Sequence, residues 1–256
     1  QGSSKRKMPP EYLARLFQQR SQARLIRFEE QPVPRSGIGD LAEHLWRRYT
    51  TRSSEAPETV LLKRSLLSRE ESGAIRASVA GVLLCCEAPE RFLPSAYIEA
   101  VRYRGVQQDT NYQADAQKIV GPLDSQINQA MAFLKRNQTV TATKEPHRVE
   151  RPQFNERAVF EAIVNAVAHR DYAVSGSKIR FFIFDDRLEI ESPGLLPFGL
   201  TVDDIAAGVS KLRNRVIGRV FHELGLIEQW GSGIRRMAGA CREAGLEAPV
   251  LEEIGT

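Results

Sequence analysis

The sequence has no apolar run near the roughly 20 residues that a membrane-spanning helix needs. A basic start, Lys5 to Lys7, is followed by no apolar block, so the pattern of a signal peptide is missing as well. Only three cysteines occur and two, Cys85 and Cys86, are adjacent, which excludes a disulfide framework. The four histidines lack metal-ligand spacing, which argues against a zinc site. These absences predict a cytoplasmic protein with no membrane partner.

Positive charge is concentrated near the start of the chain. Residues 1–60 hold 11 Lys and Arg against 7 Asp and Glu, an excess equal to the formal net charge of +4 for the whole chain. A basic leading segment, Lys5 to Arg52, suits contact with the phosphates of DNA. A solvated tail with scattered arginines is the alternative interpretation.

Residues 1–94 are predicted to form a basic lead-in and a mainly helical segment. The apolar spacing predicts helices and one strand over the following ranges: Glu11–Arg20, Asp40–Tyr49 with Asp40 as its cap, Glu58–Leu67, the strand Ile75–Ser78 and Val79–Cys86. This order is compatible with a winged-helix-like module that binds DNA. No predicted helix has a row of base-contacting side chains, so a helical spacer stays open as the alternative.

Residues 95–256 have a different pattern, in which strands alternate with helices. The predicted elements are a strand Tyr97–Arg104, a helix Leu123–Arg136 capped by Asp124, one or two strands in Thr139–Glu150, a hairpin of Lys178–Phe184 and Arg187–Glu191, helices near Val202–Ala206, Asn214–Leu224 and Ile234–Ala244, and the start of a strand in Pro249–Thr256. This order predicts an α+β fold in which a mixed sheet carries helices over one face, a two-layer sandwich.

A further predicted helix precedes the hairpin, with Asn155 as its candidate N-cap. Glu161 and Asn165 lie one turn apart on it, so both polar groups can face one cleft. An amide oxygen can ligate Mg²⁺, and a carboxylate can hold a water or accept its proton. A solvated polar edge of the helix is the alternative.

Two loops further along offer groups that suit phosphate. Gly231, Ser232 and Gly233 precede a predicted helix, where backbone N–H groups can approach an anion. Arg213 can pair with phosphate through two hydrogen bonds, and Asn214 follows it. The alternatives are a tight turn for the glycines, a surface charge for Arg213 and a helix cap for Asn214.

Taken in order, these motifs resemble the histidine-kinase-type (GHKL, Bergerat-fold) ATP-binding domain. They are more closely similar to the RecG-like C-terminal branch, found in transcriptional regulators that carry a Schlafen AlbA-type DNA-binding domain. In this resemblance Glu161 and Asn165 correspond to the N-box, Pro193-Gly194 to the first glycine box and Gly231–Gly233 to the second. The resemblance implies ATP and Mg²⁺ as cofactors and Asn165 as the metal ligand. It implies Glu161 as the catalytic residue, and a nucleotide-binding set of Asn165, Ser192, Gly194, Arg213, Asn214, Gly231, Ser232 and Gly233.

The resemblance also implies partners and missing parts. The AlbA-type domain lies upstream in the family and the first residue here is Gln1, so we expect a fragment of a DNA-associated regulator without that domain. Self-association stays open. Two departures matter, because Ile190–Gly194 contains no Asp to bind adenine and the second box has few glycines. They predict at most a slow ATPase, and they leave open a degenerate ATPase fold that acts as a scaffold, or DNA binding without nucleotide.

Overall fold

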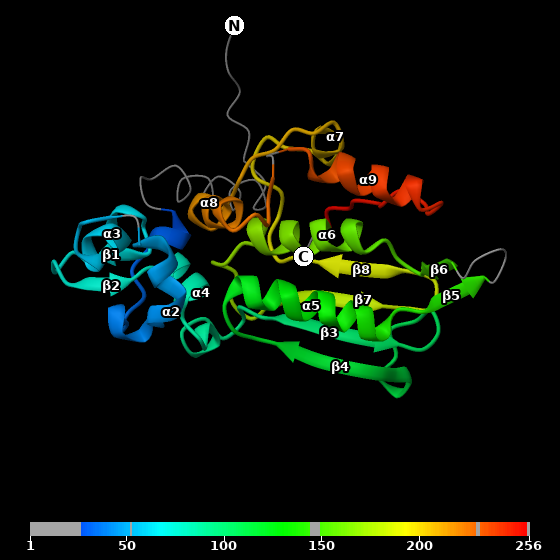
Figure 1. Cartoon of the computed structure of the whole chain (residues 1–256), viewed down its shortest axis with the longest axis horizontal. Coiled ribbons are helices and arrows are strands. Elements are labelled where there is room, and N and C mark those ends of the chain that lie inside the picture. The colour runs from blue at the N-terminus through cyan, green and yellow to red at the C-terminus, as the bar shows by residue number, and fades with distance from the viewer. Residues whose placement is uncertain (1–26, 52, 144–148, 229–230, 255–256) are drawn as a thin grey trace, which may run out of the picture.

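The computed structural model describes residues 27–51, 53–143, 149–228 and 231–254. A smaller N-terminal lobe lies beside a larger lobe built on a sheet (Figure 1). The smaller lobe contains, in chain order, the 3-10 helices η1 (Phe28–Glu30) and η2 (Ile38–Asp40), α2 (Glu43–Trp46), η3 (Arg47–Tyr49), α3 (Pro57–Lys63), β1 (Leu67–Arg69), β2 (Ile75–Ala77) and α4 (Val79–Cys85).

The larger lobe follows after η4 (Pro89–Arg91). Its elements are β3 (Ile98–Tyr103), η5 (Thr110–Tyr112), β4 (Gln113–Ile119), α5 (Leu123–Asn137), β5 (Val140–Thr143), β6 (Val149–Pro152), α6 (Glu156–His169), β7 (Ile179–Ile183), β8 (Leu188–Glu191), α7 (Val202–Ala206), α8 (Arg215–Glu223) and α9 (Gly233–Glu243).

A four-stranded mixed sheet in the order β4-β3-β7-β8 is the centre of this lobe. β3 and β7 are parallel, whereas β4 and β8 pair antiparallel with their neighbours. α5 and α6 lie over the sheet, and α9 packs across α6 (Figure 1). The predicted α+β class, a two-layer arrangement of the Bergerat type, is confirmed.

Side chains alternate along the central strands, as a sheet with two different faces requires. Ile98, Ala100 and Phe181 belong to the main core with the helices. Val101, Tyr103, Phe182 and Phe184 form a separate buried cluster, in which the Tyr103 and Phe184 rings stack with their centroids 5.3 Å apart. The helix-bearing face therefore contributes to the larger core.

The two lobes share one hydrophobic core. Leu66 and Leu83 of the first lobe belong to the same buried cluster as Ile127, Val164 and Phe221 of the second. The buried helix α4 contacts both α5 and α8, and thereby joins the lobes. The division at residues 94 and 95 and the winged-helix-like character of the first part stay predictions.

Two predicted boundaries in the first lobe are wrong. Asp40 does not cap a helix, because it lies in η2 and its Oδ2 accepts the N–H of Gly37 at 2.9 Å. α3 ends at Lys63, since Ser65 takes a left-handed conformation with φ of 57°, and Leu67 already belongs to β1. The predicted helix Glu11–Arg20 lies outside the described residues.

Further predictions are corrected in the second lobe. Pro122 occupies the N-cap position of α5, and Asp124 instead accepts a hydrogen bond from Arg48 at 2.8 Å. β4 was not predicted, because six of its seven residues are not fully buried and its polar pattern is that of an edge strand. Residues 249–254 form no strand. Among the described residues, no helix is both long and apolar enough to cross a membrane.

Candidate functional site

α6 begins as the sequence predicts. The side chain of Asn155 accepts the N–H of Ala158 at 3.1 Å, which satisfies one free donor of the first turn. Its amide also donates to the backbone oxygen of Ala240 in α9 at 3.1 Å. A single residue thus starts α6 and ties it to α9.

Glu161 and Asn165 lie on the face of α6 that meets the start of α9. A Cβ placed on Gly233 would stand 2.3 Å from Oε1 of Glu161 and 3.0 Å from Nδ2 of Asn165. Ordinary carbon contacts are longer than this, so a side chain at position 233 would displace the Glu161 and Asn165 side chains from where they lie. The predicted N-box pair and the second glycine box therefore meet in space.

The two polar groups of α6 have different surroundings. Glu161 is 14% exposed, and its Oε2 pairs with Nη2 of Arg236 at 3.0 Å. Nη1 of Arg236 also pairs with Glu228 at 2.8 Å, while its Nε is buried without a hydrogen-bond partner among the described residues. The Asn165 amide makes no hydrogen bond within the described part of the chain. The site therefore contains one paired carboxylate and one amide without a hydrogen-bond partner among the described residues.

The backbone of the loop before α9 packs closely against the backbone at Gly208. Gly231 has a φ of 79°, and a Cβ there would lie 2.7 Å from the backbone oxygen of Gly208. Ser232 is the N-cap residue of α9, and its carbonyl accepts the N–H of Arg236 at 2.9 Å. This close packing fixes the direction in which α9 crosses α6.

The segment at the predicted first glycine box lies at the C-terminal end of α6. Ser192 donates from its hydroxyl to the backbone oxygen of Ala166 at 2.7 Å, and Asp171 donates its N–H to Pro193 at 2.9 Å. Gly194 has a φ of 111°, and a Cβ there would stand 2.5 Å from the Cβ of Asp171. Glycine is needed here for a close approach as well as for the backbone angle.

Arg213 and Asn214 are bound at the same end of α6. Arg213 pairs with Asp171 at 3.0 Å, donates to the carbonyl of His169 at 3.0 Å and also donates to that of Leu195. The buried Asn214 amide donates to the carbonyls of Ala168 and Arg170 at 3.0 and 2.8 Å.

The predicted site residues thus form two groups along α6. Glu161, Asn165 and the Gly231–Gly233 loop make the first. Ser192, Gly194, Arg213 and Asn214 lie about one helical turn further on, since Asn165 and His169 are four residues apart. In the second group the side chains of Ser192, Arg213 and Asn214 donate hydrogen bonds to backbone carbonyls of the protein itself.

Burial controls the ionisation of this second group. It lowers the pKa of His169 to about 4, and the positive charge of Arg213 acts in the same direction. Burial also lowers the pKa of Arg213, although Asp171 opposes this. His169 is therefore neutral at physiological pH and leaves the Arg213–Asp171 pair undisturbed.

Sequence reasoning missed Arg236 and Asp171. Arg236 lies three residues after Gly233 and so on the same side of α9, but no local signal indicates that this side faces Glu161. Asp171 is the last residue of a His-Arg-Asp triplet, which here does not predict a kinase active site. No neighbouring residue in the sequence indicates that Asp171 binds Arg213.

Magnesium would need ligands beyond the side chains. Within the described part of the chain, no three His, Cys, Asp or Glu side chains come together as a metal-binding group. Mg²⁺ commonly binds through one or two protein oxygens together with waters and phosphate oxygens. Asn165 and Glu161 carry oxygens of the kind that arrangement uses, and Gly233 of α9 approaches both side chains closely.

Comparisons with known proteins agree with this fold. Residues 176–256 match the family described as "Putative ATP-dependent DNA helicase recG C-terminal". The chain is also similar to the crystal structure of the DIP2311 protein from Corynebacterium diphtheriae, with a TM-score of 0.67 and 21% identity over 94% of this chain and 48% of that one. At this identity the likeness concerns the fold, and the chain spans about half the length of that protein. A search of curated proteins finds no match.

These comparisons concern mainly the C-terminal part of the chain. Residues 176–256 are similar to the ATPase-type family described for the RecG C-terminal part. The matched range includes Ser192, Arg213 and the Gly231–Gly233 loop, whereas Glu161 and Asn165 lie before it.

Proposed function

We propose that the chain binds a magnesium nucleotide, ATP, between α6 and the Gly231–Gly233 loop. The observation that carries this proposal is the close approach of Gly233 to the side chains of Glu161 and Asn165. It brings the N-terminal end of an 11-residue helix beside an unpartnered amide. Helix N-termini favour anions such as phosphate.

Each residue has a distinct part in this proposal. The Asn165 amide oxygen would hold Mg²⁺, which when bound neutralises phosphate charge. Glu161 would order or deprotonate a water. The partly exposed guanidinium of Arg236, which now pairs with Glu161, would also pair with a phosphate oxygen. Ser192, Gly194, Arg213 and Asn214 would support the far end of the site.

The same contacts would limit the affinity for nucleotide and the rate of ATP hydrolysis. Arg236 already pairs with Glu161, so a ligand must compete for the carboxylate or share the guanidinium. The missing adenine-binding Asp removes a further contact. We therefore propose weak nucleotide binding and ATP hydrolysis that is slow at most.

The wider role proposed for the protein is regulatory. Nucleotide state would modulate DNA binding by an upstream AlbA-type domain in a cytoplasmic transcriptional regulator, with added contacts from the basic Lys5–Arg52 segment. Support comes from the +4 charge excess of residues 1–60 and from the ATPase-type fold.

A second candidate function is a scaffold without nucleotide, open to self-association. The closed contact between α6 and α9 favours it, because Ala158, Met237 and Ala240 pack together there. The pair between Glu161 and Arg236 neutralises the carboxylate without any ligand.

A thermal-shift titration with ATP and ADP, with and without Mg²⁺, distinguishes the two functions. Nucleotide at about 100 times its Kd adds about 2.7 kcal/mol to the free energy of unfolding. We expect a magnesium-dependent shift in the wild type and in Arg157→Ala, an exposed control position on α6. Asn165→Ala should lose the shift. No shift in the wild type favours the scaffold, and an equal shift in Asn165→Ala places the nucleotide elsewhere.

A further inference from the structure

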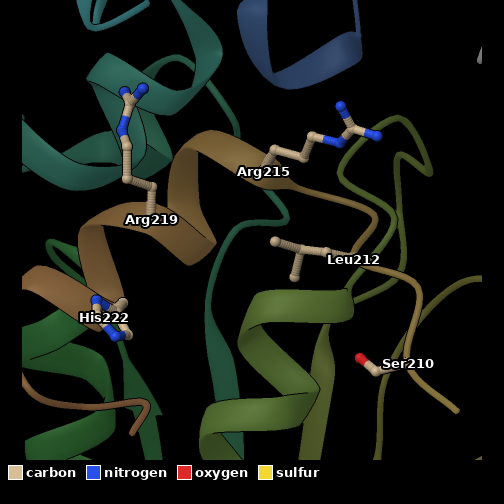
Figure 2. Close-up of a pocket in the computed structure, with 5 residues that line it drawn as sticks. All are labelled: Ser210, Leu212, Arg215, Arg219 and His222. Atoms are coloured by element: carbon tan, nitrogen blue, oxygen red, sulfur yellow. The ribbon is translucent and has the colours of Figure 1, made fainter. Parts of the chain in front are cut away.

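The outer face of α8 forms an open groove of about 430 Å³ that does not include Glu161 or Asn165. Arg215, Arg219 and His222 extend from successive turns of α8, and Ser210 and Leu212 lie on the loop before it (Figure 2). The opposite face of the helix is buried in the core, and this fixes the basic face outward. That buried face consists of Val216, Ile217, Val220 and Phe221.

The positive charge of this groove is not neutralised within the described part of the chain. None of the five lining residues is acidic. The side chains of Arg215 and His222 make no hydrogen bond or ion pair with described residues, and Arg219 donates only to the backbone carbonyl of Arg64. Glu223, the nearest acidic residue in sequence, pairs with Arg64 instead.

The position of Arg215 is unfavourable for a cation. It lies in the first turn of α8, where the helix dipole disfavours positive charge, and one turn from Arg219, which repels it. The buried carboxylate of Glu29 occupies the N–H groups of Val216 and Ile217 at 3.0 and 3.1 Å. An external anion at this face would therefore be bound by the side chains and not by the helix N-terminus.

We propose that this face of α8 binds the phosphodiester backbone of nucleic acid, with Arg215 and Arg219 each contacting a phosphate. The two residues are about 6 Å apart along the helix axis, so they face separate phosphates. Among the described residues, no Phe, Tyr or Trp lines the groove, and His222 is its one ring-bearing side chain. Exposed arginines without Phe, Tyr or Trp beside them suit contacts that depend on charge and not on sequence.

The groove is held on a rigid support. Asn214, directly before α8, donates to two carbonyls at the end of α6, and the buried face of α8 belongs to the main core. The basic side chains therefore project from a fixed helix. None of the described residues that line this surface belongs to the Lys5–Arg52 segment, and the surface requires no ATP.

Fluorescence anisotropy of a short labelled DNA duplex with the full chain, measured over a range of salt, tests the proposal. We compare Arg215→Ala/Arg219→Ala with Arg157→Ala/Arg242→Ala, which removes the same charge from exposed positions on α6 and α9. Each phosphate contact contributes about 0.9 to the slope of log K against log salt, and roughly tenfold in affinity near 50 mM salt. The groove variant should lose about 2 from the slope and roughly 100-fold in affinity.

The single variant Arg215→Ala guards against misfolding, because the Arg215 side chain is exposed and makes no hydrogen bond or ion pair with a described residue. It should lose about 1 from the slope and about tenfold in affinity. The control should bind as the wild type does. The proposal is overturned if the wild type does not bind DNA at low salt, if the slope of the groove variants is unchanged, or if the control weakens equally.

Discussion

Replacing Arg213 with Met should destabilise the fold by about 3–5 kcal/mol, the usual cost of breaking a buried ion pair by removing one partner. Arg213 and Asp171 are 11% and 13% exposed and 3.0 Å apart. The change leaves the Asp171 carboxylate buried without its cation and also frees the carbonyls of His169 and Leu195. Because the free energy of unfolding of a single domain is about 5–15 kcal/mol, this loss is a large fraction of the total.

Urea denaturation measures the effect directly. Arg180→Met is the matched control, because Arg180 pairs with Glu191 at 2.9 Å but the two side chains are 46% and 39% exposed. It should cost less than about 1 kcal/mol. Adding Asp171→Asn to Arg213→Met should restore part of the loss, since no unpaired charge stays buried. A cost below about 1 kcal/mol for Arg213→Met would refute this reasoning.

Three further predictions concern α6 and its neighbours. The folded pKa of His169, about 4, lies below its unfolded value of about 6.5, so stability should be full above pH 6.5 and fall by up to about 3 kcal/mol towards pH 4. His169→Gln should remove this dependence in urea titrations, and an unchanged pH profile would contradict it. Gly194→Ala should lower the free energy of unfolding by at least about 1–3 kcal/mol, because of the positive φ and the clash with Asp171. The control Gly239→Ala has open space in α9 and should be neutral or stabilising. Thermal unfolding measures both. Glu161→Gln should lower any ATPase rate about 100-fold with little change in nucleotide Kd, and a brisk rate indifferent to this change would place the active site elsewhere.

Local signals predicted much of the fold. Asn155 caps α6 as expected because an N-cap bond involves only the next three residues. Val202–Ala206 forms the predicted helix because Thr201 and Asp204 make a capping box. β4 was missed because an edge strand with exposed residues has no clear apolar alternation.

Long-range contacts could not be predicted in the same way. Arg213 and Asp171 are 42 residues apart, and Arg236 and Glu161 are 75 apart, so no spacing along the chain connects them. Asp124 shows the same limit, since a side chain suited to a cap instead binds Arg48 from the other lobe. The family resemblance assigned Arg213 and Asn214 to nucleotide binding. In the structure Arg213 binds Asp171, and Asn214 donates to two backbone carbonyls at the end of α6.

Hydrogen exchange with mass spectrometry, with and without Mg²⁺-ATP, tests the central claim most directly. The account predicts slower exchange in the peptides of α6 and of the loop that leads into α9, with β4 unchanged as an internal reference. Asn165→Ala should abolish this protection. Protection confined to other elements, or equal protection in Asn165→Ala, would contradict a nucleotide site between α6 and the Gly231–Gly233 loop.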